Sequence, residues 1–381
     1  MARLLGFMRG VPEETVRRWR AARWRLSRPA ANVHEAVESL LPLPAAPSAY
    51  VSLFARCASF EPRDLDRLIF EERSLEVLPL HRRGPSLVPT EAAPCLVALN
   101  RFAWGSHVRR SRVARRANAA LEATAPRVLA RLNETPKTAA EVAAGGESKG
   151  VEATLRWLAG RGEVVMGFDP PSLFGSLTFA RPRPSDRIPV LAQSGYEFLQ
   201  EVALFYFRAA GPAARDDFLW WTALSRSAAR HTIEDLAGIL EEVDLEGARK
   251  ANFMTEEDAA ELREFRGFPV SKAALLPAYD PAGSHAREGF AALCEPRLRP
   301  KIAPGGRTKP RRPVLLAGSA VGTWAATGDG AAITFDLAKA VGDEAEASIQ
   351  AAADSLGAFV RAKLAALPGA PASLRNLVRL L

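Results

Sequence analysis

Cysteine and histidine side chains are the first candidates for metal or nucleophilic chemistry in this chain. Among 381 residues no two cysteines form a CxxC pair, and no HExxH or similar ligand spacing joins the histidines. Zinc sites and disulfide frameworks need such groups at recognisable spacings. The sequence therefore predicts no metal, no cofactor and no disulfide. The side chains concerned are Cys57, Cys95, Cys294, His34, His81, His107, His231 and His285.

Arginine is the residue type with the clearest chemical meaning here. It supplies 43 of the 51 basic residues, and the formal net charge is +8. Residues 1–28 hold eight arginines, 101–116 hold six without an acid, and 297–312 hold seven basic residues without an acid, whereas 234–246 hold six acids. A solvated charged face explains any one cluster. Three basic clusters separated by acidic stretches favour one positive surface for a polyanion, because a guanidinium group binds phosphate through two hydrogen bonds.

The spacing of apolar residues predicts an α+β fold, mainly α, in four segments. The first two are each expected to be helices followed by a two-stranded hairpin, and the third to be three helices followed by a strand over 241–246; this order is typical of a winged-helix unit. Pro136 and Pro212 fall in matching places and indicate a repeat of 76 residues. The fourth segment is expected to be a small β-rich half-barrel closed by a helix over 342–364. The predicted segments are 1–120, 121–190, 191–250 and 251–381.

The chain carries no run of about 18 apolar residues, the length that a membrane span needs. We therefore expect a cytoplasmic protein with no membrane partner. We also expect a monomer, since no separate dimerisation helix or heptad run is present. Five of the seven tryptophans are expected in cores, which leaves Trp19 and Trp24 as candidates for stacking on bases.

Four stretches carry a resemblance to a known family. The chain resembles the AlkZ-like and YcaQ-like winged-helix DNA glycosylases, which release alkylpurines and unhook interstrand crosslinks. The resemblance implies tandem winged helices that form a curved basic surface, and double-stranded DNA, alkylated or crosslinked, as the partner. The stretches are LDRLIFEERSLEVLPLHRRGPSLVP (65–89), YFRAAGPAARDDFLWWTAL (206–224), LLPAYDP (275–281) and VLLAGSAVGTWAA (314–326).

The resemblance also implies a catalytic motif that this chain lacks. The family places Gln, then Gln or Asp two residues later, to activate the water that attacks the sugar. Those two positions fall on Pro42 and Pro44 here. Proline offers no side-chain donor or acceptor, so it cannot orient a water. In the hairpin, Ser86 stands where the family has His.

Three functional hypotheses follow. The first is a DNA-binding protein with lost or altered catalysis, and the second is a glycosylase with a substitute group, for which Glu38 is the candidate and Glu35 the nearest other acid. The third is a transcriptional regulator. The arginines expected to contact DNA are Arg20, Arg23, Arg25, Arg28, Arg82, Arg83, Arg109, Arg110, Arg112, Arg115 and Arg156.

Overall fold

The computed structural model describes most of the chain. The exceptions are residues 1–7, 41, 81–83, 111, 145–147, 184–196, 249, 268–272, 284, 287–288, 304–310, 328–329 and 331. For residues 8–9, 104–110, 112–115 and 148–149 the backbone alone is described. No helix in the described part of the chain is both long enough and apolar enough to cross a membrane.

A helix, a short strand, two helices and a hairpin form the first unit, which we call unit one. Its short strand lies at one edge of an antiparallel sheet of order β2-β4-β3. An edge position suits this strand because Pro44 has no backbone N–H and cannot donate a hydrogen bond to a second neighbouring strand. The elements are α2 (Val33–Glu38), β2 (Leu43–Pro44), α3 (Ser48–Phe54), α4 (Pro62–Phe70), β3 (Leu75–Pro79) and β4 (Pro85–Pro89).

The same order of elements recurs in unit two. Its sheet has the order β5-β7-β6, so the short strand again pairs with the second strand of the hairpin. The side chain of Thr138 caps α7 and accepts from the amide of Glu141, the capping box that the sequence predicts. The elements are α6 (Arg112–Ala130), β5 (Lys137–Thr138), α7 (Ala139–Ala143), α8 (Ser148–Gly160), β6 (Val165–Asp169) and β7 (Ser176–Ala180).

Unit three repeats the order once more. Its strands lie in the order β8-β10-β9, where β8, β9 and β10 correspond to β5, β6 and β7 of unit two. The short strands β5 and β8 begin 76 residues apart, directly after Pro136 and Pro212, and β2 likewise begins directly after Pro42. The predicted repeat is thereby confirmed. The elements are α9 (Glu197–Ala210), β8 (Ala213–Ala214), α10 (Arg215–Thr222), α11 (Arg226–Asp235), β9 (Leu240–Leu245) and β10 (Asn252–Thr255).

The N-terminal segment packs against unit three, although the predicted division groups it with the first 120 residues. Strand β1 (Met8–Val11) adds in parallel to the free edge of β9. Trp19 of helix α1 (Glu13–Arg23) lies in a core shared with β9, β10 and helix α12 (Glu256–Glu264). Both Trp19 and Trp24 are buried, so the prediction that they are available for stacking is wrong.

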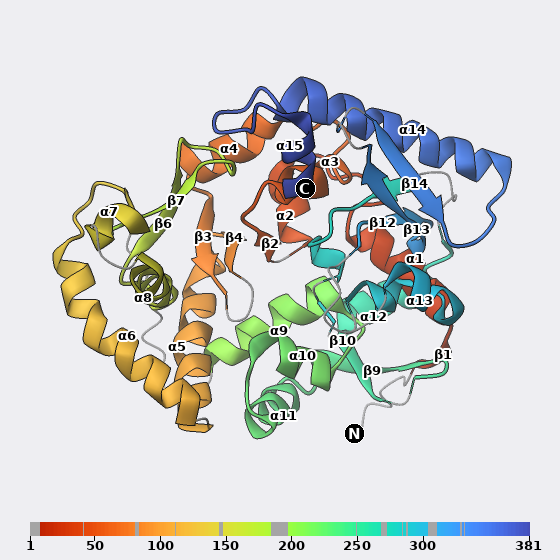
Figure 1. Ribbon diagram of the computed structural model, residues 1–381. Helices are drawn as coiled ribbons and strands as arrows, with labels where there is room; N and C mark the ends of the chain where they lie inside the picture. Colours follow the sequence, from red (N-terminus) through yellow and green to blue (C-terminus); the bar gives the residue numbers. More distant parts are fainter. Residues whose placement is uncertain are drawn as a thin grey trace.

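Two long helices connect unit one to unit two. Helix α5 (Ala93–Arg110) is followed almost at once by α6, and the two run along one edge of the molecule (Figure 1). The apolar pattern alone predicts shorter helices here. The extra turns contain arginine and alanine, which are strong helix formers, so the helix continues through the basic cluster 101–116 apart from residue 111, which is not described.

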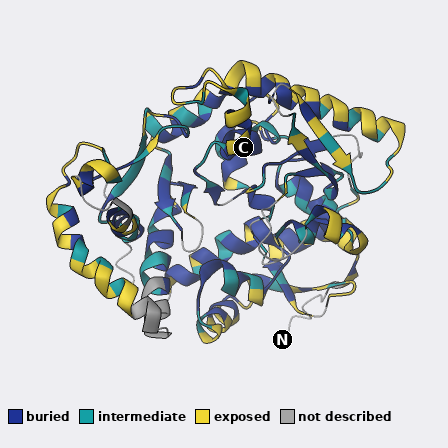
Figure 2. Cartoon of the chain, viewed as in Figure 1, coloured by how far each residue is buried: buried dark blue, intermediate teal, exposed yellow. Residues whose placement is uncertain are grey.

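The C-terminal part is a four-stranded antiparallel sheet covered by a helix, as the sequence predicts. Strands β11 (Ala273–Leu275), β12 (Pro313–Leu316), β13 (Ser319–Ala326) and β14 (Ile333–Leu337) follow in that order. Helix α14 (Asp343–Phe359) packs across this sheet, and its outer face is exposed (Figure 2). Several short helical elements complete the C-terminal part. They are η2 (Pro281–Gly283), η3 (Gly289–Leu293), η4 (Pro296–Leu298), α13 (Arg299–Ile302), the helical turn Val360–Leu364 and α15 (Leu374–Leu380).

Unit one and the C-terminal sheet share a single hydrophobic core. The rings of Phe54 and Phe359 stack with centroids 4.3 Å apart, and Phe60 packs against the same ring. Leu65 and Ile349 are buried in the same cluster. The first and last parts of the chain therefore stabilise each other, which the predicted linear division does not express.

Candidate functional site

The segment on which the sequence resemblance places a catalytic motif, residues 42–44, contains the edge strand of unit one. Pro42 is buried just before β2, and Pro44 pairs with Ser86 across the ladder between β2 and β4. Leu43 pairs with Leu87 in the same way. Positions 44 and 86, two of the three at which the resemblance predicts a departure from the family pattern, are therefore direct cross-strand neighbours. The side chains of these two residues supply one polar group, the hydroxyl of Ser86. Its Oγ lies 3.5 Å from the carbonyl oxygen of Gly84.

Glu38, the candidate substitute acid, lies at the end of α2 and its side chain is 51% exposed. One carboxylate oxygen is 3.6 Å from Nδ1 of His34. Glu91 joins them, so that one possible ligand atom from each of the three residues lies within 4.8 Å of the others. This group could coordinate a cation, but exposed carboxylates often gather without one. The sequence spacing does not indicate it, because Glu91 comes from beyond the hairpin.

Glu35, the other nearby acid, is engaged in the fold. Its carboxylate forms an ion pair with Arg25 at 2.7 Å and accepts from the backbone amide of Ala31 at 2.7 Å. This carboxylate therefore fixes the chain at the start of α2. Neither acid close to the motif segment is buried, so neither lies in the dry surroundings in which a general base is usually activated.

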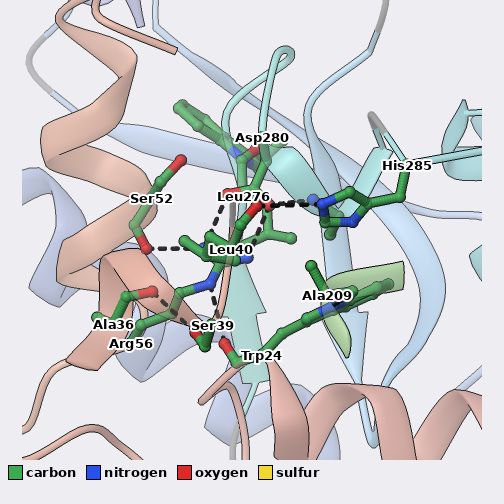
Figure 3. A network of polar contacts seen from close by, with 12 residues as sticks. Trp24, Ala36, Ser39, Leu40, Ser52, Arg56, Ala209, Leu276, Asp280 and His285 are labelled. Atoms are coloured by element: carbon green, nitrogen blue, oxygen red, sulfur yellow. Dashed lines mark hydrogen bonds and ion pairs between the residues drawn. The ribbon is translucent and has the colours of Figure 1, made fainter. Parts of the chain in front are cut away.

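A buried ion pair anchors the end of α3 beside this segment. Both side chains of Arg56 and Asp280 are fully buried, and the guanidinium donates to the two carboxylate oxygens at 2.7 and 2.8 Å (Figure 3). Arg56 also donates to the carbonyl oxygens of Trp24 at 3.0 Å and Ser52 at 2.7 Å. One side chain thus connects α3, the end of α1 and the loop that follows β11.

His285 and Trp24 extend the same network to unit three. Nε2 of His285 lies 3.1 Å from the carbonyl oxygen of Leu40, two residues before Pro42, and Nε1 of Trp24 donates to the carbonyl oxygen of Ala209 at 2.7 Å (Figure 3). Tyr206 of α9 donates to the carbonyl oxygen of His285 at 2.8 Å. Parts of the chain that are distant in sequence therefore meet around the segment that carries the motif position.

A second network fixes unit two against unit one. The hydroxyl of Tyr50 donates to Asp66 at 2.6 Å, lies 3.3 Å from Oγ of Ser172, and accepts from the amide of Leu173 at 3.1 Å. Burial raises the pKa of Asp66 to about 6, and burial together with Asp66 raises the pKa of Tyr50 above its ordinary value. Ser172 lies between β6 and β7, so the tip of this hairpin is held by α3 and α4.

Three of the expected DNA contacts at the N-terminus have partners within the protein. Arg20 donates to the carbonyl oxygen of Pro212, and burial lowers the pKa of its guanidinium. Arg23 forms ion pairs with Asp258 at 2.8 Å and Glu261 at 3.3 Å. As described above, Arg25 pairs with Glu35. These three side chains hold α1 and the following turn in place.

The remaining expected contacts lie at the surface or outside the described side chains. Arg28 is exposed, and Arg156 of α8 pairs with Glu152 at 2.7 Å. Arg82 and Arg83 lie outside the described residues. For the other four, only the helical backbone at the junction of α5 and α6 is described; they are Arg109, Arg110, Arg112 and Arg115.

The repeat places further exposed arginines that sequence reasoning missed. The third helix of unit one carries Arg63 and Arg67, and the third helix of unit three carries Arg226 and Arg230. Each lies in a segment of mixed charge, so charge clustering does not find it. The position of each arginine in the third helix of its unit would have identified it.

Comparisons with known proteins agree with this architecture. The family model "DNA glycosylase AlkZ-like" matches residues 39–359. The structure is similar to that of Streptomyces sahachiroi DNA glycosylase AlkZ, with a TM-score of 0.72 and 19% sequence identity, over 91% of this chain and 97% of that chain. No curated protein matches the sequence. The similarity in structure confirms the predicted α+β fold class. Because the family model covers most of its length, the chain belongs to the AlkZ-like DNA glycosylase family.

Proposed function

We propose that this protein binds double-stranded DNA as a repair-glycosylase relative whose own base-releasing chemistry is lost or altered. Membership of a DNA glycosylase family supports DNA as the partner. The three units, each with a helix, a short strand, two helices and a hairpin, support the interpretation that they are winged helices. The net charge of +8 favours binding to phosphates.

The observation that carries the altered chemistry is the pairing of Pro44 with Ser86. Glycosidic hydrolysis by this family requires a polar group at the motif to hold a water against the sugar. At this place the chain supplies two prolines and a serine hydroxyl directed to a backbone carbonyl. None of these can act as a base at neutral pH.

Glu38 is the group on which the alternative depends, namely an active glycosylase. Its carboxylate is exposed and lies beside His34, so in this arrangement it lacks the dry surroundings in which a general base is usually activated. Activity that depends on Glu38 would require α2 to present this side chain to the DNA. Substitution of Glu38 by glutamine therefore separates the two hypotheses.

The phosphate contacts are assigned by the same reasoning. Arg20, Arg23 and Arg25 would have to lose contacts within the protein before they could bind DNA, so we assign them to the fold. We propose that phosphate contacts come from the exposed side chain of Arg28 between α1 and α2, from the chain between β3 and β4, and from the junction of α5 and α6. These are Arg28, Arg82, Arg83, Arg109, Arg110, Arg112 and Arg115.

The test is the salt dependence of binding to a labelled duplex, measured by fluorescence anisotropy. Each lost phosphate contact lowers the slope of log K against log salt by about 0.9. The double variant Arg109→Ala/Arg110→Ala should lower the slope by about 2. The matched control Arg375→Ala/Arg379→Ala removes two exposed charges from α15 and should leave the slope unchanged. Equal effects of both double variants, or no binding at low salt, would contradict the proposal.

A further inference from the structure

Tyr279 is an exposed aromatic side chain on a loop whose described residues are otherwise buried or half-buried. Its exposed fraction is 62%. Within the described part of the chain, the other large apolar side chains that are clearly exposed are Ile239 and Leu380, and neither is aromatic. A phenol ring held in water forgoes the stabilisation that burial of its apolar surface would supply. The ring is therefore free to contact a ligand without loss of packing in the core.

The loop that carries Tyr279 is held rigidly on both sides. The next residue, Asp280, is fully buried in the ion pair with Arg56. The Asp280 carboxylate also accepts from the amide of Ala282 at 2.9 Å, and the Asp280 amide donates to the carbonyl oxygen of Pro277 at 3.2 Å. The backbone that presents the ring is thus ordered before any ligand arrives. A side chain presented in this way loses little conformational entropy on binding, which is characteristic of binding hot spots.

The same loop contacts the motif segment. It runs from β11 through Asp280 to His285, and His285 lies 3.1 Å from the carbonyl oxygen of Leu40 (Figure 3). Arg56 reaches the loop from the end of α3. Tyr279 therefore extends into solvent from an element that packs directly against the chain leading to Pro42 and Pro44. The ring lies on a loop that contacts the segment to which the sequence resemblance assigns the catalytic motif.

We infer that Tyr279 stacks on a nucleobase displaced at a distorted site in duplex DNA. This inference rests on the proposed function and specifies which feature of the DNA is recognised. A flat ring with a polar tip suits a base face, whereas a fully paired duplex hides its base faces within the stack. Stacking of this kind discriminates distorted from paired DNA without any bond being cut. A protein that does not hydrolyse the glycosidic bond would still recognise damaged DNA in this way.

The experiment compares binding of the full chain to two duplexes of equal length, one fully paired and one with a single unpaired 2-aminopurine. Removal of a stacking ring typically weakens binding by about tenfold or more. Tyr279→Ala should therefore lose about tenfold affinity for the duplex with the unpaired base and less than about twofold for the paired duplex. The quenching of 2-aminopurine on binding should disappear as well.

Two control variants keep the test specific. Tyr279→Phe retains the ring and should bind like the wild type, and Ile239→Ala removes a different exposed apolar side chain and should change nothing. Unchanged binding of both duplexes by Tyr279→Ala would overturn the inference while leaving the proposed function in place. Failure of the wild type to bind either duplex at low salt would overturn both. Equal thermal unfolding of the variants establishes that folding is intact.

Discussion

Replacing Asp280 with alanine should destabilise the protein severely, because it leaves the Arg56 guanidinium buried without its counter-charge. Two charge-assisted hydrogen bonds are lost, to the two oxygens at 2.7 and 2.8 Å, at a site where both side chains are fully buried. The backbone amide of Ala282 also loses its acceptor. Removal of one partner from a buried pair costs about 3–5 kcal/mol. We expect a loss of this size in the free energy of unfolding.

Differential scanning calorimetry measures the effect. At about 2 °C per kcal/mol, the lower end of the range because the chain is long, the expected fall in Tm is about 6–10 °C. The control Glu152→Ala breaks the exposed pair with Arg156 and should leave Tm nearly unchanged. The double variant Arg56→Met/Asp280→Leu should recover most of the loss, since no charge then stays buried. A Tm within 1 °C of the wild type for Asp280→Ala, or a double variant no better than the single one, would refute the reasoning.

Three further predictions concern the networks around the site. The pKa of Asp66 is raised to about 6, so between about pH 4 and 6 the folded state holds a proton that the unfolded chain releases. The free energy of unfolding should therefore fall as pH rises through this range. A series of Tm values against pH should show less of this fall in Asp66→Asn. Tyr50→Phe removes the acceptor of the Leu173 amide, so hydrogen exchange at that amide should speed up while exchange in α14 stays unchanged. Gln at both Pro42 and Pro44 should produce detectable release of 7-methylguanine from alkylated duplex, and release no faster than that of the wild type would argue against this strand as the place where activity was lost.

Local sequence patterns were sufficient for several elements and insufficient for their assembly. The hairpins of the first two units and the capping box at Thr138 follow from residues close together in the chain, and Pro136 and Pro212 identify the repeat, whereas the second strand of the third hairpin was not predicted. The burial of Trp19 does not follow in this way. Its partners Val243 and Met254 come from more than 200 residues away, and an amphipathic helix with arginine on one side looks the same whether it faces DNA or unit three.

The same limit explains the arginines at the candidate site. Arg23 has its partners at Asp258 and Glu261, and Arg56 has its partner at Asp280, all supplied by distant parts of the chain. A count of local charge therefore exaggerates the number of free cations near the N-terminus. The prediction that Pro42 and Pro44 take the place of the motif, in contrast, depends only on residue type and on the alignment implied by the resemblance, and it stays a prediction.

The most direct test of the central claim measures binding and base release on one sample. A duplex with a single N7-methylguanine is saturated with protein at low salt, binding is recorded by anisotropy, and free 7-methylguanine is then quantified by chromatography. Salt-sensitive binding with release no faster than the spontaneous rate is the predicted result. Faster release that is abolished in Glu38→Gln would contradict the loss of hydrolysis, and the absence of any binding would contradict the assignment to DNA.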